Sequence, residues 1–471
     1  MGVIKTGTRG KIIKLATELV ETSGYSGHIC RLYNGGMARS VVSCVALVFL
    51  LLPLPVGAEE YPLVPDNPAR HSVERRRDQF SKDFAYFVYP IAGSVPGLGT
   101  ASGAGATVAN VGETNADFTG FYIDGDFKAT GVAVTDLHII SERLVANLGS
   151  YTYKVSPMVF RRGMDSSKDD YILPFWDGYS NVGQLALTFD ERRYEFYARF
   201  MNSSGSLSRI LDKNHNEFSN VDKSLHTENS LNLGFWLDIT DDVQDPRKGT
   251  RVEGVRHSTF EQQYMTSQFN IYDVNLTEYI PVGLSSTWAF NAYYSTAEKQ
   301  SSASTDRTEL RNAIGLNCAA ITNPASKAQC DATEKQFLDD RIAYNQFGMA
   351  SYLGGTQRLR SYPNGRFFAG KSVFYGTELR LNLTDEKTLM DWFFLRGLRT
   401  NLQVAFFAEV GGVAESDSDL HKQMRPSYGA GFRALFSGVT IRLDVGFGDE
   451  GGQMQLFLDY PWSLFSVDRP G

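Results

Sequence analysis

The residues from Val373 to Leu383 alternate strictly between two kinds of side chain, and this pattern constrains the fold more than any other feature of the chain. One set is mostly apolar and consists of Val373, Tyr375, Thr377, Leu379, Leu381 and Leu383. The other set consists of Gly376, Glu378, Arg380 and Asn382. A period of two is typical of an antiparallel β-strand whose faces meet different surroundings. Since no helix is predicted that could cover the apolar face, we predict that lipid covers it.

Similar runs recur along the chain, separated by polar or glycine-rich turns, which is the pattern of an all-β sheet or barrel. About sixteen are predicted, an even number typical of bacterial outer-membrane barrels. They are Phe84–Ile91, Thr100–Val111, Asp117–Ile123, Phe127–Asp136, Arg143–Tyr153, Asn181–Asp190, Arg193–Phe200, Ser230–Thr240, Thr250–Phe260, Phe269–Ile280, Thr287–Ala297, Val373–Leu383, Asn401–Val410, Ser427–Phe436, Val439–Phe447 and Gln453–Tyr460. The sequence therefore predicts a transmembrane antiparallel β-barrel over residues 84–471.

Charged residues within these runs indicate which face points inwards. In the run Val439–Phe447, Arg442 and Asp444 alternate with aliphatic residues. An arginine facing lipid at the membrane midplane costs roughly 2–4 kcal/mol, so the charged set is expected to line a polar lumen. A water-soluble sandwich with its apolar face inside is the alternative. The 13% content of aromatic residues favours the barrel, because barrels carry aromatic girdles at both membrane interfaces.

The N-terminal part of the chain is expected to direct export. Residues 41–52 are continuously apolar, follow Arg39 and precede a small-residue site that ends at Ala58. This arrangement predicts a signal peptide over residues 37–58, and the run is too short for a helix of ~20 residues that spans a membrane. Residues 1–36 are interpreted as a spurious extension, if the true start is Met37, or as a cytoplasmic segment. Residues 59–83 are expected to form a short periplasmic segment.

Connections between the predicted strands are either tight or long, as expected of a barrel with two different ends. Asp190–Arg192 and Ser437–Gly438 are tight turns, and counting strands places them on the periplasmic side. The long polar loops are Lys154–Ser180, Met201–Asn229 and Glu298–Ser372. An exception is the periplasmic link Thr384–Thr400, whose apolar run Met390–Leu395 suggests an interfacial segment.

Little in the sequence points to a cofactor, a metal, nucleic acid or catalysis. Cys318 and Cys330 lie in the longest loop, and an oxidising compartment favours a disulfide between them. No histidine lies between them to complete a metal site. The net charge of −7 without a basic block argues against nucleic acid. No serine–histidine motif is recognisable and no helix follows the glycine-rich stretch Gly97–Gly105, so we do not expect an enzyme. That stretch is instead predicted to be a strand that bends or lies against a plug.

Several stretches of the second half resemble a known family. They are DITDDVQDPRKGTRVEG at 238–254, ASYLGGTQRLRSYPNGRFFAG at 350–370, YGTELRLNL at 375–383, AFFAEVGGV at 405–413 and SYGAGFRALFSGVTIRLDVGF at 427–447. Together they resemble the bacterial surface antigen family, the barrel domain of BamA/TamA-like outer-membrane assembly proteins. Two positions depart from the family pattern: Ser361 replaces a glycine after Arg360, and Glu409 stands where the family usually has aspartate.

The resemblance implies a long extracellular loop that folds into the lumen and is held there by an arginine. Carried over to this chain, that arginine is Arg360, its partners are Glu409 and Glu378, and Tyr362 is the aromatic residue of the same signature. Strand alternation also places Glu378 and Glu409 inside. The alternative is that Arg360 is a solvated loop residue in a weak ion pair.

The resemblance also implies a function, namely the insertion, assembly or translocation of outer-membrane proteins or lipids at the bacterial outer membrane. The expected partners are outer-membrane lipid, unfolded outer-membrane proteins and a periplasmic accessory protein. The alternative is a structural or passive pore-like barrel without assembly activity. Residues 59–83 are too few for a polypeptide-transport-associated domain, and this favours the alternative.

Overall fold

The computed structural model divides the chain into two units, Met1–Gly57 and Ala58–Gly471. The structure describes residues 76, 79–80, 83–215, 217, 225–260, 266–283, 286–316, 318–384, 390–392, 395–398, 400–436 and 439–464. The predicted extension 1–36 and signal peptide 37–58 lie outside the described residues, as does most of the predicted periplasmic segment 59–83.

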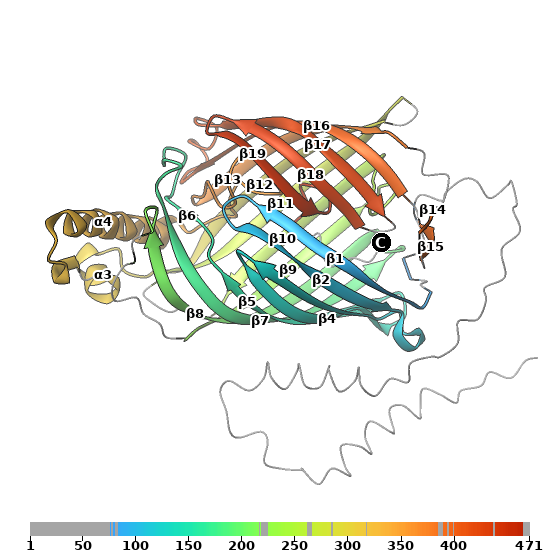
Figure 1. The fold of residues 1–471 in the computed structure, drawn as a ribbon, viewed down its shortest axis with the longest axis horizontal. Helices are drawn as coiled ribbons and strands as arrows, with labels where there is room; N and C mark the ends of the chain where they lie inside the picture. Colours follow the sequence, from blue (N-terminus) through green and yellow to red (C-terminus); the bar gives the residue numbers. More distant parts are fainter. Residues whose placement is uncertain are drawn as a thin grey trace, which may run out of the picture. The chain divides into compact units, whose positions relative to one another are not determined.

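Within the described residues, sixteen antiparallel strands form a closed barrel (Figure 1). They are β1 (Ala85–Val95), β2 (Gly99–Ala109), β3 (Asp117–Gly125), β4 (Lys128–Ile140), β5 (Leu144–Val155), β7 (Tyr171–Phe189), β8 (Tyr194–Asp212), β9 (Leu225–Asp238), β10 (Gly249–Thr259), β11 (Gln268–Val282), β12 (Ser286–Ser301), β13 (Lys371–Asn382), β16 (Thr400–Ala414), β17 (Arg425–Phe436), β18 (Val439–Gly448) and β19 (Gly451–Leu458). Each pairs with its neighbour in this order, and β1 meets β19 to close the barrel. The predicted barrel of about sixteen strands is confirmed.

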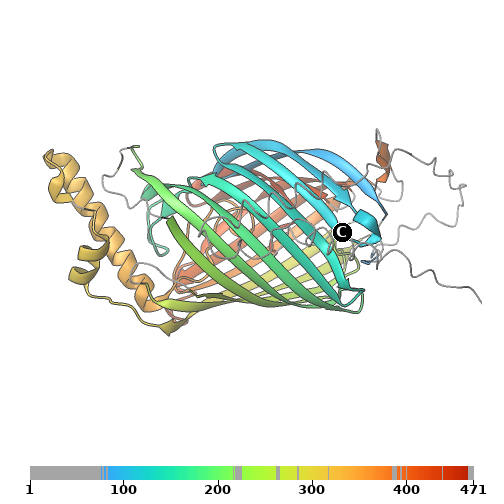
Figure 2. The ribbon, with the colours of Figure 1, turned by 90° about the horizontal axis from the view of Figure 1, so that it is seen from below.

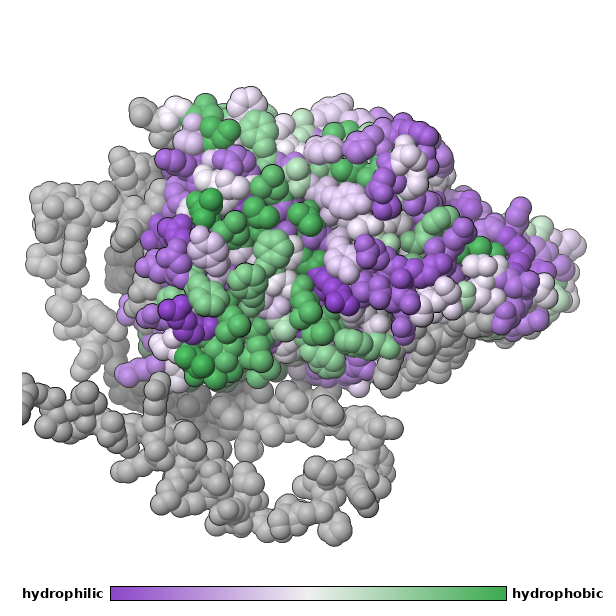
Figure 3. Space-filling view, turned by 180° about the vertical axis from the view of Figure 1, so that it is seen from behind, coloured by the Kyte–Doolittle hydropathy of each residue, from purple (hydrophilic) through white to green (hydrophobic). Residues whose placement is uncertain are grey.

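The strands alternate between an apolar outer face and a polar lumenal face. In β8, Tyr194 and Phe196 are exposed on the outer face while Glu195 and Tyr197 are buried. In β18, Leu443 is exposed and Asp444 is buried. Figure 3 shows apolar residues gathered on the barrel wall, and a mostly hydrophilic surface on the end that projects from it. The charged side chains therefore face the lumen, as the alternation predicts.

The longest connection, predicted as a long polar loop, contains helices. It holds α3 (Arg307–Ile314), the short helix η3 (Cys318–Ala320) and α4 (Pro324–Phe347). Capping side chains begin both α-helices: Asp306 accepts a hydrogen bond from the backbone of Glu309, and Asn323 caps α4, whose first residue is a proline. The helices project from one end of the barrel and leave its wall uncovered (Figures 1 and 2). No helix in the described part of the chain is long and apolar enough to cross a membrane.

Two other predicted loops are partly wrong, because strands extend into them. β7 begins at Tyr171 and β8 continues to Asp212, and the two are paired from end to end. The extension of β8 is rich in serine, which hides it from an argument based on apolar alternation. Its serines bond across the strands instead: the hydroxyls of Ser180 and Ser203 lie 2.8 Å apart. A two-residue strand, β6 (Val159–Phe160), adds to the start of β7.

The end of the barrel with the short turns carries two further elements. β14 (Met390–Trp392) and β15 (Leu395–Leu398) form a small hairpin within the link predicted to hold an interfacial segment. The described residues of the segment before β1 contact the turns at this end. Arg76 donates a hydrogen bond to the carbonyl of Thr240 (3.3 Å), and the Asn115 amide donates one to the carbonyl of Phe80 (2.7 Å).

Cys318 and Cys330 form a disulfide that joins η3 to α4, with 5.6 Å between their Cα atoms. Both residues are buried, although a loop position suggests exposure. The bond closes a ring with a sequence separation of 12.

Replacing both cysteines by serine is expected to destabilise the α3–α4 region by about 3 kcal/mol against local unfolding, because a ring of this size restricts the unfolded chain. Limited proteolysis should cut this region faster, while the barrel keeps its heat-modifiable mobility on gels. Quantitative alkylation of both thiols in the unreduced native protein would contradict the bond itself.

Candidate functional site

A loop from Leu353 to Phe367, here called the lumenal loop, folds into the barrel. Its base is closed by two backbone hydrogen bonds, from Leu353 N to Phe367 O (2.8 Å) and from Phe367 N to Leu353 O (3.0 Å). Gly354 and Gly355 have φ angles of 105° and 99°, which side chains rarely permit, and they turn the chain sharply inwards. Apolar residues of the loop pack in one buried cluster with Phe374 of the barrel wall.

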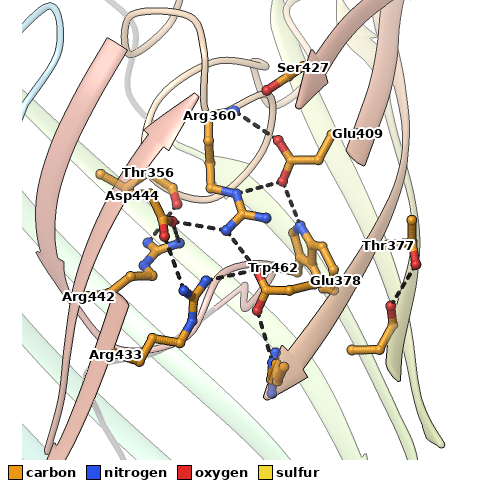
Figure 4. A network of polar contacts seen from close by, with 12 residues as sticks. Thr356, Arg360, Thr377, Glu378, Glu409, Ser427, Arg433, Arg442, Asp444 and Trp462 are labelled. Carbon is orange, nitrogen blue, oxygen red and sulfur yellow. Dashed lines mark hydrogen bonds and ion pairs between the residues drawn. The ribbon is translucent and has the colours of Figure 1, made fainter. Parts of the chain in front are cut away.

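Arg360 at the tip of the lumenal loop contacts three carboxylates on the lumenal wall (Figure 4). Its Nε donates to Glu409 Oε1 at 2.8 Å, and its Nη1 lies 2.8 Å from Glu378 Oε2 and 2.9 Å from Asp444 Oδ2. Its backbone N–H also donates to Glu409 Oε2 at 2.9 Å. Its side chain is 0% exposed, so the alternative of a solvated Arg360 is wrong.

The guanidinium plane of Arg360 also lies over an aromatic ring, with its Cζ atom 3.6 Å from the centroid of Phe407. A delocalised, planar cation suits this position, because it can stack on a ring while its edge donates hydrogen bonds to carboxylates. Glu378 and Glu409, which the family resemblance pairs with Arg360, both contact it. Asp444 was not predicted as a partner.

These residues belong to a larger group, the lumenal charge cluster, which comprises Arg360, Arg380, Arg433, Arg442, Glu378, Glu409 and Asp444. Glu378 lies 2.9 Å from Arg380 Nε and 2.8 Å from Arg433 Nη2, and Arg442 Nη1 lies 3.2 Å from Asp444. With four arginines and three carboxylates, the cluster has a formal charge of +1. It joins β13, β16, β17 and β18 through the inside of the barrel.

Alternation alone could place these side chains on the lumenal face but could not pair them. Glu378 on β13 reaches Arg433 on β17, and β16 lies between these two strands. Such a contact depends on the curvature of the closed wall, which brings side chains of non-adjacent strands together across the lumen. The sequence analysis therefore identified Arg360, Glu378 and Glu409. It missed the three arginines of the wall, Arg380, Arg433 and Arg442, that complete the cluster.

Tyr362 and Ser361 fix the loop beside Arg360. The Tyr362 hydroxyl donates to Pro426 O (3.0 Å) and accepts from the backbone N–H of Asp449 (3.1 Å). Ser361, where the family pattern has glycine, donates its backbone N–H to the Ser427 hydroxyl at 3.1 Å. The side chain of Ser361 is 2% exposed, and its hydroxyl has no hydrogen-bond partner among the described residues.

Gly446 on β18 lets the loop approach the wall. A Cβ atom at this position would lie 3.1 Å from Ser361 N and 3.2 Å from the carbonyl carbon of Arg360. Both are backbone atoms of the docked loop, so neither can rotate away from a new side chain.

We expect Gly446→Val to weaken docking of the lumenal loop by about 1–3 kcal/mol, as overpacking does in a close-packed interior. Protease cleavage within the loop should increase while the barrel still folds. Gly120→Val on β3 is the control, because the nearest atom to a Cβ there is 4.0 Å away. Equal cleavage in both variants would contradict close docking.

The chain after β19 also enters the lumen, which the sequence did not predict. The strand ends at Leu458 rather than Tyr460, and residues Asp459–Leu464, here called the lumenal tail, turn inwards. Asp459 and Trp462 have φ angles of 77° and 73°. Trp462 is 1% exposed, and its indole N–H donates to Glu409 Oε1 at 3.1 Å (Figure 4). The same carboxylate oxygen thus accepts hydrogen bonds from the loop and from the tail.

The seam between β1 and β19 is paired far less than other neighbouring strands. Among the described residues its ladder has one residue pair, Ser94 opposite Leu456. By contrast, β1 is paired with β2 along its whole length. The lumenal loop bridges the seam from inside: Asn364 N donates to Pro96 O (2.7 Å) in the β1–β2 turn, and Gln455 of β19 donates to Arg360 O (3.4 Å). The glycine-rich stretch that begins at Gly97 therefore does lie against an inserted segment, since a Cβ at Gly97 would be 3.2 Å from Asn364 N.

The described residues contain no group of three or more histidine, cysteine or carboxylate side chains placed to hold a metal ion. The chemistry of the lumen is instead that of ion pairs and aromatic contacts. This arrangement can hold a segment of chain inside the barrel.

The fold and site together define a closed sixteen-stranded barrel with a loop folded into its lumen. No family model and no curated protein matches the chain. Among solved structures, it is similar to BamA from Haemophilus ducreyi lacking POTRA domains 1-3, at 11% identity and a TM-score of 0.48, over 80% of this chain and 71% of that one.

It is also similar to two structures of CdiB. For CdiB from Acinetobacter baumannii the identity is 9% and the TM-score 0.46, over 79% of this chain and 59% of that one. For CdiB from Escherichia coli the identity is 9% and the TM-score 0.47, over 79% and 62%. The chain therefore spans less than two thirds of both CdiB structures, and at these identities the likeness concerns the fold alone.

Proposed function

We propose that this protein is an outer-membrane barrel of the surface antigen type that inserts, assembles or translocates outer-membrane proteins or lipids by opening its seam. The observation that carries the proposal is the seam itself, paired at Ser94 and Leu456 among the described residues and bridged from inside by the lumenal loop. The exposed apolar wall supports a membrane location, since lipid covers such a surface in barrels that span a membrane.

The physical basis is the small number of backbone hydrogen bonds that hold the seam. Strand edges in a membrane must be satisfied, because an unpaired backbone group in hydrocarbon costs several kcal/mol. A seam with a short ladder exposes the edges of β1 and β19 to an incoming strand, which could pair with them by β-augmentation. The wall elsewhere is continuously paired, so opening is expected at this one place.

The partners follow from this proposal. Outer-membrane lipid surrounds the barrel, unfolded outer-membrane proteins are the polypeptide substrates, and a periplasmic accessory protein delivers them. Resemblance of the loop, with Arg360 and Tyr362, to the surface antigen signature supports membership of that family. The proposed activity is assembly or transport and does not include catalysis.

A passive, pore-like barrel is the rival function. A passive pore requires an open lumen, whereas the lumen of this barrel contains the buried lumenal loop and Trp462. Conductance of the purified protein in planar bilayers separates the two, since a passive pore should conduct continuously and the proposed barrel should conduct only in brief openings.

A disulfide across the seam tests the proposal. Ser94→Cys with Leu456→Cys places thiols on residues that are directly opposite in the ladder, where antiparallel Cα atoms lie about 4.5–5.5 Å apart and can be bridged. We expect the oxidised variant to lose support of outer-membrane protein assembly in a depletion assay and to regain it with reductant. Ala92→Cys with Ser102→Cys bridges β1 and β2 and is the matched control. If the locked seam supports assembly as well as this control does, the proposal is wrong.

A further inference from the structure

We infer that the lumen contains a peptide-binding site with two aromatic subsites, occupied here by the chain's own lumenal tail. The ligand class is a polypeptide segment that adopts a turn and carries two aromatic side chains two residues apart. The inference deepens the proposed function, on which its biological role rests, by naming what the barrel recognises in an incoming polypeptide. The site itself is defined by contacts of Tyr460 and Trp462.

The first subsite holds an indole. Trp462 lies between Glu409, which accepts its N–H at 3.1 Å, and Phe374, whose ring centroid is 6.5 Å from that of the indole. Arg358 Nη2 donates to the Trp462 carbonyl at 3.4 Å, and the Asn275 amide donates to the same oxygen. The pocket therefore recognises both an aromatic donor and the backbone that carries it.

The second subsite holds a phenol. The Tyr460 hydroxyl lies 2.7 Å from Asp245 Oδ1 and 2.9 Å from Gln403 Oε1. The guanidinium carbon of Arg380 is 4.1 Å from the centroid of the tyrosine ring, a cation–π contact. Both tail residues are buried, so each aromatic side chain is recognised by a polar group at its tip and by packing at its face.

The tail is held as a bound peptide is, through side chains of the site rather than through a ladder. Among the described residues, the last backbone–backbone hydrogen bond between the tail and the wall is from Asp459 N to Thr440 O (2.6 Å). Beyond it, Glu253 accepts from Ser463 Oγ (3.4 Å) and from Leu464 N (3.3 Å). A segment bound in this way can exchange for another without breaking strand pairing in the wall.

Occupancy of the site is linked to the lumenal loop by a shared carboxylate and by the contact of Arg358 with the Trp462 carbonyl. Glu409 Oε1 accepts hydrogen bonds from both Trp462 Nε1 and Arg360 Nε. Because β19 leads directly into the tail, release of the tail also removes an anchor from one edge of the seam. An incoming segment that replaces the tail would therefore act on the loop and on the seam together.

Binding of a labelled peptide to the purified full chain tests the inference. The probe has the sequence of residues 459–464, DYPWSL, with a fluorophore at one end. A tethered segment competes at an effective concentration on the order of millimolar, so the native chain should bind the probe poorly. In Tyr460→Ala/Trp462→Ala the cis competitor is weakened, and we expect at least roughly tenfold tighter binding, equivalent to about 1.4 kcal/mol. A probe with alanine in place of both aromatic residues should not bind.

Further variants assign binding to the site. In the Tyr460→Ala/Trp462→Ala background, Asp245→Ala or Asn275→Ala should reduce probe binding about tenfold or more, while Phe432→Ala on the outer face should leave it unchanged. Heat-modifiable mobility verifies folding of each variant. The single change Tyr460→Phe removes only a hydroxyl, and it should still raise probe binding about threefold if the double variant does not fold.

The inference is overturned if folded variants bind the probe no better than the native chain, or if the alanine probe binds equally well. The measurement uses purified protein and no assembly machinery, so it is independent of the seam-locking experiment. If the probe binds as expected and the variant with the locked seam still supports assembly, the peptide-binding site stands and the proposed function is wrong. If the probe does not bind and the locked seam abolishes assembly, the site is wrong and the proposed function stands.

Discussion

Arg360→Ala is expected to release the lumenal loop while the barrel still folds and inserts. The arginine is fully buried and contacts Glu378, Glu409 and Asp444 at 2.8–2.9 Å. Removing one partner of a buried ion pair costs about 3–5 kcal/mol, because the other charge is left uncompensated. Here release of the loop lets water reach the carboxylates, so the cost appears as undocking of the loop. We expect protease cleavage near Ser361 and higher conductance.

Two further variants test whether the ion pairs of Arg360 hold the loop. Arg425→Ala removes a partly exposed arginine, 32% exposed, whose ion pair with Asp449 spans 3.3 Å. It should have little effect, because ion pairs in contact with solvent contribute about 0–1 kcal/mol. Glu409→Ala should resemble Arg360→Ala, and the double variant should be less than additive since both changes remove one interaction. A protease-resistant loop in Arg360→Ala would show that its ion pairs do not hold the loop.

Glu378→Ala is expected to destabilise the barrel wall itself and not only the lumenal loop. This carboxylate contacts Arg360, Arg380 and Arg433 at 2.8–2.9 Å, and the last two belong to β13 and β17. Its removal raises the formal charge of the lumenal charge cluster from +1 to +2 and leaves the buried Arg380 without its carboxylate, whereas Arg433 keeps Asp444 at 3.2 Å. The expected loss is about 3–5 kcal/mol in the free energy of unfolding, measured by urea titration in detergent.

A rescue variant distinguishes this mechanism from a general packing defect. Combining Glu378→Ala with Arg380→Met removes both partners of a buried pair, and stability should largely return, because replacing both is often neutral or stabilising. Glu298→Ala, at an exposed site near the end of β12, is the control and should change little. Failure of the rescue would indicate that Glu378 stabilises the wall by packing rather than by charge.

The strands were predictable because a barrel wall repeats one local rule. Each residue of β13 or β18 has the lumen on one side and the outer surface on the other, so alternation of Glu378 with Thr377, or of Asp444 with Leu443, reports the face directly. The rule fails where polar residues line both faces, as in the serine-rich end of β8. It also gives no information about α3 and α4, which begin at capping residues instead.

The sequence by itself indicated about sixteen strands and the face on which their side chains lie, and the family resemblance pointed to Arg360 of the lumenal loop. Only the tertiary structure decided which charges pair, since Glu378 and Arg433 lie on strands separated by β16 and meet through the curvature of the closed wall. It also decided the path of the lumenal tail, which depends on positive φ angles at Asp459 and Trp462 that no local pattern predicts for these residue types. The seam with its single residue pair was also decided by the tertiary structure. The register in which β1 and β19 meet is set by the other fifteen strand pairings around the barrel.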